Sequence, residues 1–230
     1  MRRYGFVVET LQRSRVWCTG DYLTWIWPFR HTHTHTHTRT IEFRNKFTDS
    51  IEAVNADEVY GIFAAPTCTM FSLARTTAKT PRDFESGMKL VKKCLEIIWF
   101  CRGSNNSTLK FWALENPQGY LRQFLGRPPF TFSPEEYGEN YTKKTDIWGY
   151  FNIPKKSPYK LSPDEQLLSC RNNRVLPELP DDYIMPEGWN RQAARRSMTS
   201  KRFAEAFYKA NKWKVAKMNN PYFNSEGYAD

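Results

Sequence analysis

The residues of this chain best suited to catalysis are a cysteine and a glutamate, Cys68 and Glu115. Each follows a short apolar run typical of a buried strand, residues 59–64 before Cys68 and residues 109–114 before Glu115. A thiolate can add to a pyrimidine ring while an acid protonates a ring nitrogen, and this addition activates a carbon that is otherwise a poor nucleophile. An isolated cysteine is also a common small buried apolar residue, and its own position leaves that alternative open for Cys68.

A helix between the two apolar runs predicts that these residues lie together. Residues 80–102 carry apolar side chains at three- and four-residue spacing, with Thr80 as a plausible N-cap and Gly103 at the end. Strand, helix and strand form a βαβ unit, in which the two strands are parallel neighbours. Because the C-terminal ends of parallel strands face the same crevice, we expect Cys68 and Glu115 to be close.

Three segments, in order, resemble motifs of the DNA cytosine-5 methyltransferases. Residues 66–72 (PTCTMFS) resemble the catalytic loop, and residues 115–117 (ENP) resemble the Glu-Asn motif. Residues 137–145 (YGENYTKKT) are similar to the segment in which tyrosine and glycine precede glutamine-x-arginine-x-arginine. In this chain Tyr141 replaces the glutamine, Lys143 stands at the first arginine and Thr145 replaces the second. The resemblance covers about residues 55–152 and is strongest to the short proteins of this kind in phages and large DNA viruses.

The resemblance implies a Rossmann-like α/β fold and transfer of a methyl group from S-adenosylmethionine to C5 of cytosine in DNA. It implies that Cys68 adds to C6 of the base and that Glu115 holds and protonates N3. Asn116 would help to order the catalytic loop, and Lys143 would contact the base or a phosphate. The target base would have to leave the duplex to reach these groups.

The cofactor half of the family pattern is only partly recognisable. The glycine-rich turn that holds the methionine part of S-adenosylmethionine is absent, and residues 6–8 are the candidate second strand. Asp21 resembles the acid that contacts the adenine amine, although a turn or capping aspartate is an equally good interpretation. Pro66 is the other residue that the resemblance assigns to the cofactor site. We therefore expect a truncated or divergent N-terminal half that lacks the first strand and the glycine-rich turn.

Composition favours a polyanionic partner in an intracellular setting. The chain of 230 residues has a formal net charge of +10, which favours a polyanionic partner, although generic basicity is common in soluble proteins and remains an alternative from charge alone. No apolar run approaches the length of a membrane span, and the N-terminus lacks a signal-peptide core. Five irregularly placed cysteines make neither a zinc spacing nor a disulfide framework. We expect the cytoplasm of a bacterial host, or the nucleus or cytoplasm of a host cell if the protein is viral.

Three regions follow from these patterns. Residues 1–152 are the predicted methyltransferase-like core, with a His-Thr repeat at 31–38 that contains all four histidines. Such a repeat is typical of a mobile loop, and we expect no specific metal site there. Residues 153–190 are rich in proline and form a candidate reduced target-recognition region. Residues 191–230 are basic, and we expect a helix capped by Thr199 or Ser200 that contacts phosphates.

Two other classes of function remain open from the sequence. One is a DNA-binding protein of the same fold that has lost its cofactor site, which the missing glycine-rich turn favours. The other is an enzyme that uses the same thiol on free pyrimidine nucleotides, which the basic C-terminal region argues against. The sequence predicts neither the target sequence nor the oligomeric state.

Overall fold

The fold is taken from a computed structural model, which describes residues 15–19, 22–28, 40–44, 51–75, 78–103, 105, 107–158, 179, 185 and 190–212. The chain divides into two compact units, and each is described by itself. The larger, which we call the sheet unit, contains Arg13–Thr131 and Thr145–Phe151. The smaller, which we call the C-terminal unit, contains Phe132–Lys144 and Asn152–Val215.

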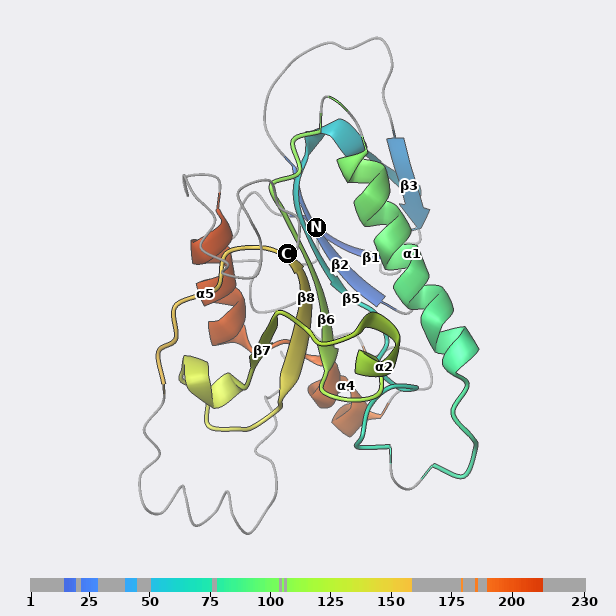
Figure 1. The fold of residues 1–230 in the computed structure, drawn as a ribbon, viewed down its shortest axis with the longest axis vertical. Coiled ribbons are helices and arrows are strands. Elements are labelled where there is room, and N and C mark those ends of the chain that lie inside the picture. The colour runs from blue at the N-terminus through green and yellow to red at the C-terminus, as the bar shows by residue number, and fades with distance from the viewer. Residues whose placement is uncertain are drawn as a thin grey trace. The chain divides into compact units, whose positions relative to one another are not determined.

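The described residues form a mixed α/β structure around one main sheet, which confirms the expected α/β class (Figure 1). Its strand order is β1-β2-β5-β6-β8-β7. These strands are β1 (Arg15–Thr19), β2 (Tyr22–Pro28), β5 (Val59–Ala65), β6 (Phe111–Pro117), β8 (Thr145–Tyr150) and β7 (Phe130–Phe132). β5 and β6 pair in parallel, whereas β1 with β2, β2 with β5, and β6 with β8 pair antiparallel. The sheet is therefore mixed.

The predicted βαβ unit is confirmed, with a helix that starts later than expected. Helix α1 spans Phe84–Arg102 between β5 and β6. Its N-cap is Asp83, whose side chain accepts a hydrogen bond from the Ser86 N–H at 2.9 Å. The Thr80 hydroxyl instead accepts a hydrogen bond from the Arg75 guanidinium at 2.8 Å. The predicted N-cap at Thr80 is therefore wrong, because the Thr80 hydroxyl bonds to Arg75 of the preceding loop and not to the helix.

Helix α1 covers one face of the sheet and makes the main core of the sheet unit (Figure 1). Its buried residues recur at three- and four-residue spacing, as an amphipathic helix on a sheet requires. The core combines residues of α1, β5 and β6, among them Val91, Cys94, Ile98, Cys101, Ile62, Ala64 and Leu114. Gly103 ends the helix as predicted, with its N–H donating to the Trp99 carbonyl at 2.8 Å. β5 and β6 are thereby held firmly by packing and by neighbours on both sides.

The other described elements of the sheet unit are short. The one-turn helix α2 (Arg122–Leu125) lies between β6 and β7, and β8 follows β7 in the chain. Two strands before β5 pair antiparallel with each other, and one 3-10 turn follows them. These elements are β3 (Thr40–Arg44), β4 (Ile51–Asn55) and η1 (Ala56–Glu58). The candidate strand at 6–8 and the repeat at 31–38 lie outside the described residues, as does most of 153–190.

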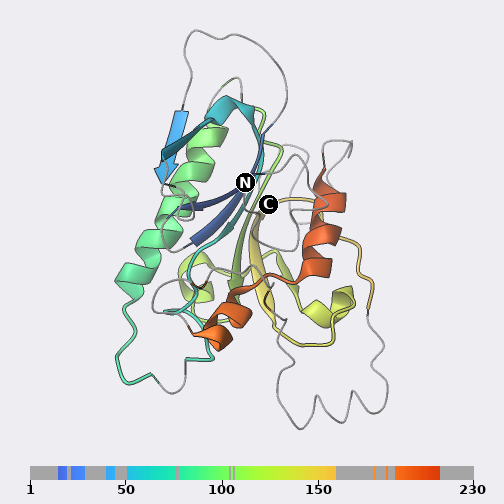
Figure 2. The same ribbon diagram turned by 180° about the vertical axis from the view of Figure 1, so that it is seen from behind.

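The C-terminal unit contains η2 (Pro134–Tyr137), α4 (Arg191–Ser197) and α5 (Lys201–Asn211). Figure 2 shows α4 and α5 following one another in orange and red. Ser200 is the N-cap of α5, and its side chain accepts from the Phe203 N–H at 3.2 Å. Phe203 and Phe207, four residues apart on one face of α5, are both buried. Phe132 stacks on Phe203 with ring centroids 3.6 Å apart, which ties α5 to the segment before η2.

Candidate active site

The ends of β5 and β6 bring the two predicted catalytic segments to the same edge of the sheet. In the parallel register Ala64 of β5 pairs with Leu114 of β6. Glu115 and Asn116 come directly after Leu114, so they lie beside the end of β5. The loop that carries Cys68 leaves β5 at this point, and we call residues 66–75 the Cys68 loop. Cys68 is partly exposed, whereas Glu115 is 5% exposed and Asn116 is fully buried.

Asn116 ties β6 to the first residue of the Cys68 loop. Its side-chain Nδ2 donates a hydrogen bond to the Pro66 carbonyl at 3.1 Å. Its Oδ1 is buried and has no hydrogen-bond partner among the residues that the structure describes. Because side chains alternate along a strand, Asn116 lies on the same face as Leu114 in the α1 core, and Glu115 lies on the opposite face. The amide therefore reaches the loop from the α1 side, while the carboxyl group projects from the other side.

The Cys68 loop folds back in a tight turn that is anchored by a buried ring. The N–H groups of Phe71 and Ser72 both donate to the Cys68 carbonyl, at 2.9 and 2.8 Å. Phe71 is fully buried. Its ring packs against Phe84 at 6.1 Å and, edge to face, against Phe124 at 5.9 Å. The turn after Cys68 is thus fixed to the first residue of α1 and to α2.

Arg82 holds the outer part of the same loop. Its guanidinium donates to the carbonyls of Met70 and Ser72, at 2.8 and 2.9 Å. The same group lies 4.8 Å from the centroid of the Tyr120 ring, within cation–π range. Because a guanidinium presents several donors in one plane, a single side chain can bind both carbonyls at once. Arg82 therefore positions the loop from the residue before the α1 cap.

Gly119 brings the segment after β6 against the Cys68 loop. Ser72 and Gly119 form an isolated antiparallel bridge, and the Tyr120 N–H donates to the Phe71 carbonyl at 2.9 Å. A Cβ atom on Gly119 would lie 2.3 Å from the Phe71 oxygen, so this close backbone approach requires glycine. The loop is therefore held from both strands of the βαβ unit.

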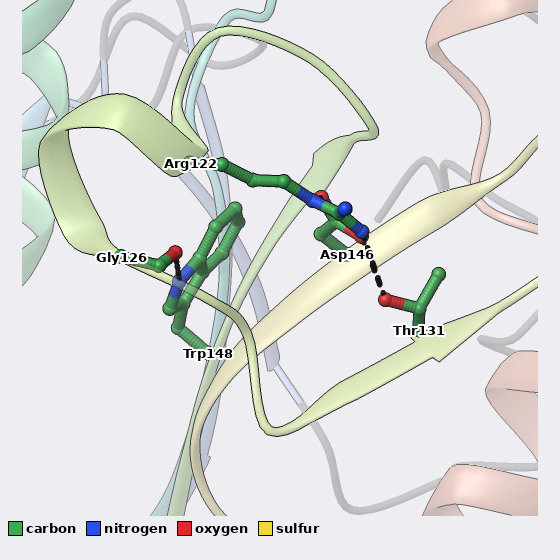
Figure 3. Close-up of polar contacts among 5 residues, drawn as sticks. All are labelled: Arg122, Gly126, Thr131, Asp146 and Trp148. Carbon is green, nitrogen blue, oxygen red and sulfur yellow. Dashed lines mark hydrogen bonds and ion pairs between the residues drawn. The ribbon is translucent and has the colours of Figure 1, made fainter.

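A partly buried ion pair between Arg122 and Asp146 fixes the start of β8 (Figure 3). Asp146 pairs with Asn116 across the sheet and is fully buried. Its carboxylate accepts from Nε and Nη2 of Arg122, each at 2.6 Å, and from the Thr131 hydroxyl at 2.8 Å. The hydrogen bond to Asp146 raises the pKa of Arg122, so the guanidinium stays charged. A second bond, from Trp148 Nε1 to the Gly126 carbonyl at 3.1 Å, fixes the far end of α2 to β8.

Lys143 belongs to the C-terminal unit, and Asp21 lies outside the described residues. Lys143 Nζ donates to the Met198 carbonyl at 3.3 Å, which joins the segment 137–145 to the stretch between α4 and α5. Glu139, in the same segment, accepts from the Ser200 hydroxyl and the Arg202 N–H, each at 3.2 Å. An acidic side chain at this helix start is favourable because the N-terminal end of a helix carries partial positive charge. Hydrogen bonds therefore join the third motif to the start of the basic helix α5.

The cysteines whose side chains the structure describes differ in accessibility. Cys68, Cys94 and Cys101 form no disulfide bond. Cys94 and Cys101 are buried in the α1 core, and burial raises the pKa of Cys94 to about 12. A raised thiol pKa favours the neutral form, so Cys94 carries almost no thiolate at neutral pH. Of these three thiols, Cys68 is the one placed to react.

We predict that a thiol-alkylating reagent modifies Cys68 in the folded protein well before Cys94 or Cys101. Alkylation requires an accessible thiolate, and Cys94 must wait for unfolding or for pH near its raised pKa. Peptide mapping by mass spectrometry after a time series of iodoacetamide treatment at pH near 8 measures each site separately. Labelling of Cys94 as fast as Cys68 would show that the α1 core opens readily. A parallel sample in denaturant must label all three.

Comparison with protein-family models, curated proteins and solved structures finds no match to this chain. The proposed role of this site is therefore based on its geometry and not on a known relative. In the described part of the chain, no group of three or more histidine, cysteine or acidic side chains is arranged to hold a metal ion. The same residues contain no helix that is both long enough and apolar enough to cross a membrane.

Sequence reasoning found the ends of β5 and β6 but missed the groups that position the Cys68 loop. Arg82 and Gly119 carry no motif, and their roles depend on which backbone atoms the fold brings near them. The Arg122–Asp146 pair was missed for the same reason, since the partners come from α2 and β8. The sequence did contain one signal for this pair. Asp146 is a charged residue at the start of a run that is otherwise typical of a buried strand, and a buried charge is almost always paired.

Proposed function

We propose that this protein forms a covalent bond between Cys68 and a cytosine base in DNA, as the DNA cytosine-5 methyltransferases do, and that it methylates C5. The observation that supports this most is the βαβ unit, which brings the Cys68 loop and Glu115 to one sheet edge. The Asn116 to Pro66 hydrogen bond adds support, because it fixes the backbone two residues before the nucleophile. On this account the site belongs to a Rossmann-like methyltransferase fold.

Each residue has a defined task in the proposed reaction. The Cys68 thiolate adds to C6 of the cytosine, and the Glu115 carboxyl group donates a proton to N3. Protonation at N3 prevents charge from building up on the ring as the thiolate adds. After methylation at C5, loss of the C5 proton to a base would expel the Cys68 thiolate from C6 and restore the ring. Glu115 is 5% exposed, which keeps competing water away from its carboxyl group. Asn116 and Arg82 position the loop through its carbonyl groups.

The target cytosine must be extruded from a duplex, or be unpaired already, to reach these groups. The formal net charge of +10 supports a phosphate-rich partner. Seven basic residues lie in the described stretch 190–212, together with a single acidic residue, Glu205. We propose that this stretch contacts the DNA backbone, and that Lys143, which belongs to the same unit, contacts the base or a phosphate.

The methyl donor implied by the resemblance is S-adenosylmethionine, which would supply an activated methyl group to C5. The described residues do not fit a glycine-rich cradle for it, because the outer neighbour of β5 is the antiparallel strand β2. A glycine-rich turn would follow the C-terminal end of a parallel strand at that place. Pro66 is buried and its carbonyl already accepts from Asn116. The strand β2 directly follows Asp21 in the chain, and its Leu23 pairs with Ala65.

That antiparallel neighbour favours a second candidate function. A DNA-binding protein of the same architecture, without methyl transfer, would keep the basic surfaces and the loop but need no cofactor cradle. An enzyme acting on free pyrimidine nucleotides is less well supported, because the positive charge far exceeds what one nucleotide requires.

A methyl-transfer assay separates the first two candidates. We predict that purified protein incubated with DNA and methyl-labelled S-adenosylmethionine produces labelled 5-methylcytosine, identified by nucleoside chromatography. Calorimetry with S-adenosylmethionine alone measures cofactor binding directly. Tight DNA binding with no cofactor binding at millimolar concentration would favour the DNA-binding function. Protein with Cys68→Ser is the control, because it should bind DNA and transfer no methyl group.

A further inference from the structure

Two large apolar side chains are exposed on the segments that border the Cys68 loop. Leu73 is 55% exposed and lies in the loop itself, and Phe124 is 45% exposed and lies in α2. The two segments are joined by the Ser72–Gly119 bridge and by the hydrogen bond from Tyr120 to Phe71. Single exposed apolar residues are common, so the surroundings of this pair decide whether it has a role.

The Phe124 ring is presented by a packed aromatic cluster. Its centroid lies 5.4 Å from that of Phe84 and 5.9 Å from that of Phe71. Tyr120 packs on Phe84 at 5.8 Å and lies under the Arg82 guanidinium. The cluster therefore holds Phe124 in place while leaving almost half of it open to solvent. Figure 1 shows α2 next to the N-terminal end of α1, where this cluster forms.

Basic residues lie close in sequence to both exposed apolar residues. Arg75 donates to the Thr80 hydroxyl and to the Pro81 carbonyl, and Arg82 donates to backbone carbonyls. Both guanidinium groups are thus bonded to neutral oxygens, and within the described residues neither one pairs with a carboxylate. Lys79, which follows the Cys68 loop, and Arg127, which follows α2, are two further exposed basic residues. These four cations complement a partner that carries phosphates.

We propose that Leu73, Tyr120 and Phe124, with Arg75 and Arg82, form a platform on which unpaired bases of single-stranded DNA stack. A flat aromatic ring among cations gains most from a base whose face is free, and in a duplex both faces of each base are covered by its neighbours. The platform borders the Cys68 loop, so the stacked bases would flank the target cytosine. The inference deepens the proposed function and rests on it for the substrate, and its test needs neither cofactor nor thiol.

The test measures binding of a fluorescein-labelled single strand of about 12 nucleotides and of its duplex by anisotropy, without cofactor. We expect Phe124→Ala to weaken single-strand binding about 5- to 150-fold, the range for loss of one stacked base. The matched control is Phe100→Ala, because Phe100 is 40% exposed and lies in the last turn of α1. It is about 24 Å from Phe84 along the helix, at 1.5 Å per residue. Its affinity should equal that of the wild type.

Two more variants separate stacking from folding. Phe124→Trp keeps a flat ring and should retain single-strand affinity, whereas Leu73→Ala removes a side chain that is mostly exposed and should weaken it. Thermal unfolding of each variant shows whether the aromatic cluster survives. Equal weakening of single strand and duplex by Phe124→Ala would overturn the proposal in favour of a wedge that enters duplexes. Unchanged affinity, or an equal loss in Phe100→Ala, would also overturn it.

These outcomes are distinguishable from failure of the proposed function. If Cys68 does no chemistry, single-strand binding through Phe124 is still measurable, including in Cys68→Ser protein. If the chemistry is present but Phe124→Ala binds single strands normally, the platform is wrong and the active site stands.

Discussion

Replacing Cys68 with serine is expected to abolish covalent attachment of the protein to DNA that contains 5-fluorocytosine. On the proposed mechanism the thiolate would add to C6 and a methyl group would be transferred to C5, but fluorine at C5 cannot leave as a proton would, so the reaction would stop at a covalent adduct. Serine is close in size to cysteine, and Cys68 lies in a partly exposed loop, so the fold should change little. Denaturing electrophoresis of labelled DNA measures the adduct, which should require S-adenosylmethionine.

The matched controls for this experiment are Cys94→Ala and Cys101→Ala. Both residues are buried in the α1 core, and we expect these variants to lose stability but to form adduct at temperatures where they stay folded. Adduct formed equally well by Cys68→Ser protein would identify another nucleophile. Absence of adduct in the wild type, despite tight DNA binding, would leave the DNA-binding function.

The second large effect is expected from Glu115→Gln. The amide has nearly the same shape but cannot donate the proton that N3 needs, so adduct formation should slow by about 10²- to 10⁴-fold, the usual contribution of a positioned acid or base. Rapid-quench sampling of adduct against time measures the rate. Because DNA binding does not need this proton, the affinity for DNA should be retained.

Glu139→Gln is the matched control for Glu115. Glu139 accepts hydrogen bonds at the start of α5 in the C-terminal unit, so its loss should lower stability slightly. A rate of adduct formation in Glu115→Gln protein equal to that of the Glu139→Gln control would remove Glu115 from the mechanism.

The part of the fold that the sequence predicts best is the βαβ unit. Its two strands are almost entirely buried, so their sequences are nearly continuous apolar runs. The apolar residues of α1 recur at helical spacing. These are local signals that survive without knowledge of the rest of the chain. Local spacing also predicted Ser200 as one of two candidate caps of α5.

Strand direction outside this unit could not be predicted, because it depends on contacts between distant segments. β2 pairs antiparallel with β5, and β8 pairs antiparallel with β6. The residues of β2 and β8 alone do not indicate which strand each one pairs with. The same limit applies to the helix start. Thr80 is a good N-cap by type, but Arg75 occupies its hydroxyl and Asp83 caps the helix instead.

For the candidate site, topology predicted the neighbourhood but not the orientation. Parallel pairing places the Cys68 loop beside the end of β6, as the crossover argument requires. Asn116 reaches the Pro66 carbonyl from the α1 face, and Glu115 lies on the other face. Both positions follow from the strand register. The register is itself set by packing in the core.

The most direct test of the central claim is to identify the atom of the protein that bonds to the base. Wild-type protein is trapped on 5-fluorocytosine DNA with S-adenosylmethionine, digested with protease and nuclease, and sequenced by tandem mass spectrometry. The account predicts one modified peptide in which a methylated fluorocytosine is attached to Cys68. A base attached to any other residue, or no modified peptide from protein that binds both DNA and S-adenosylmethionine, would contradict it.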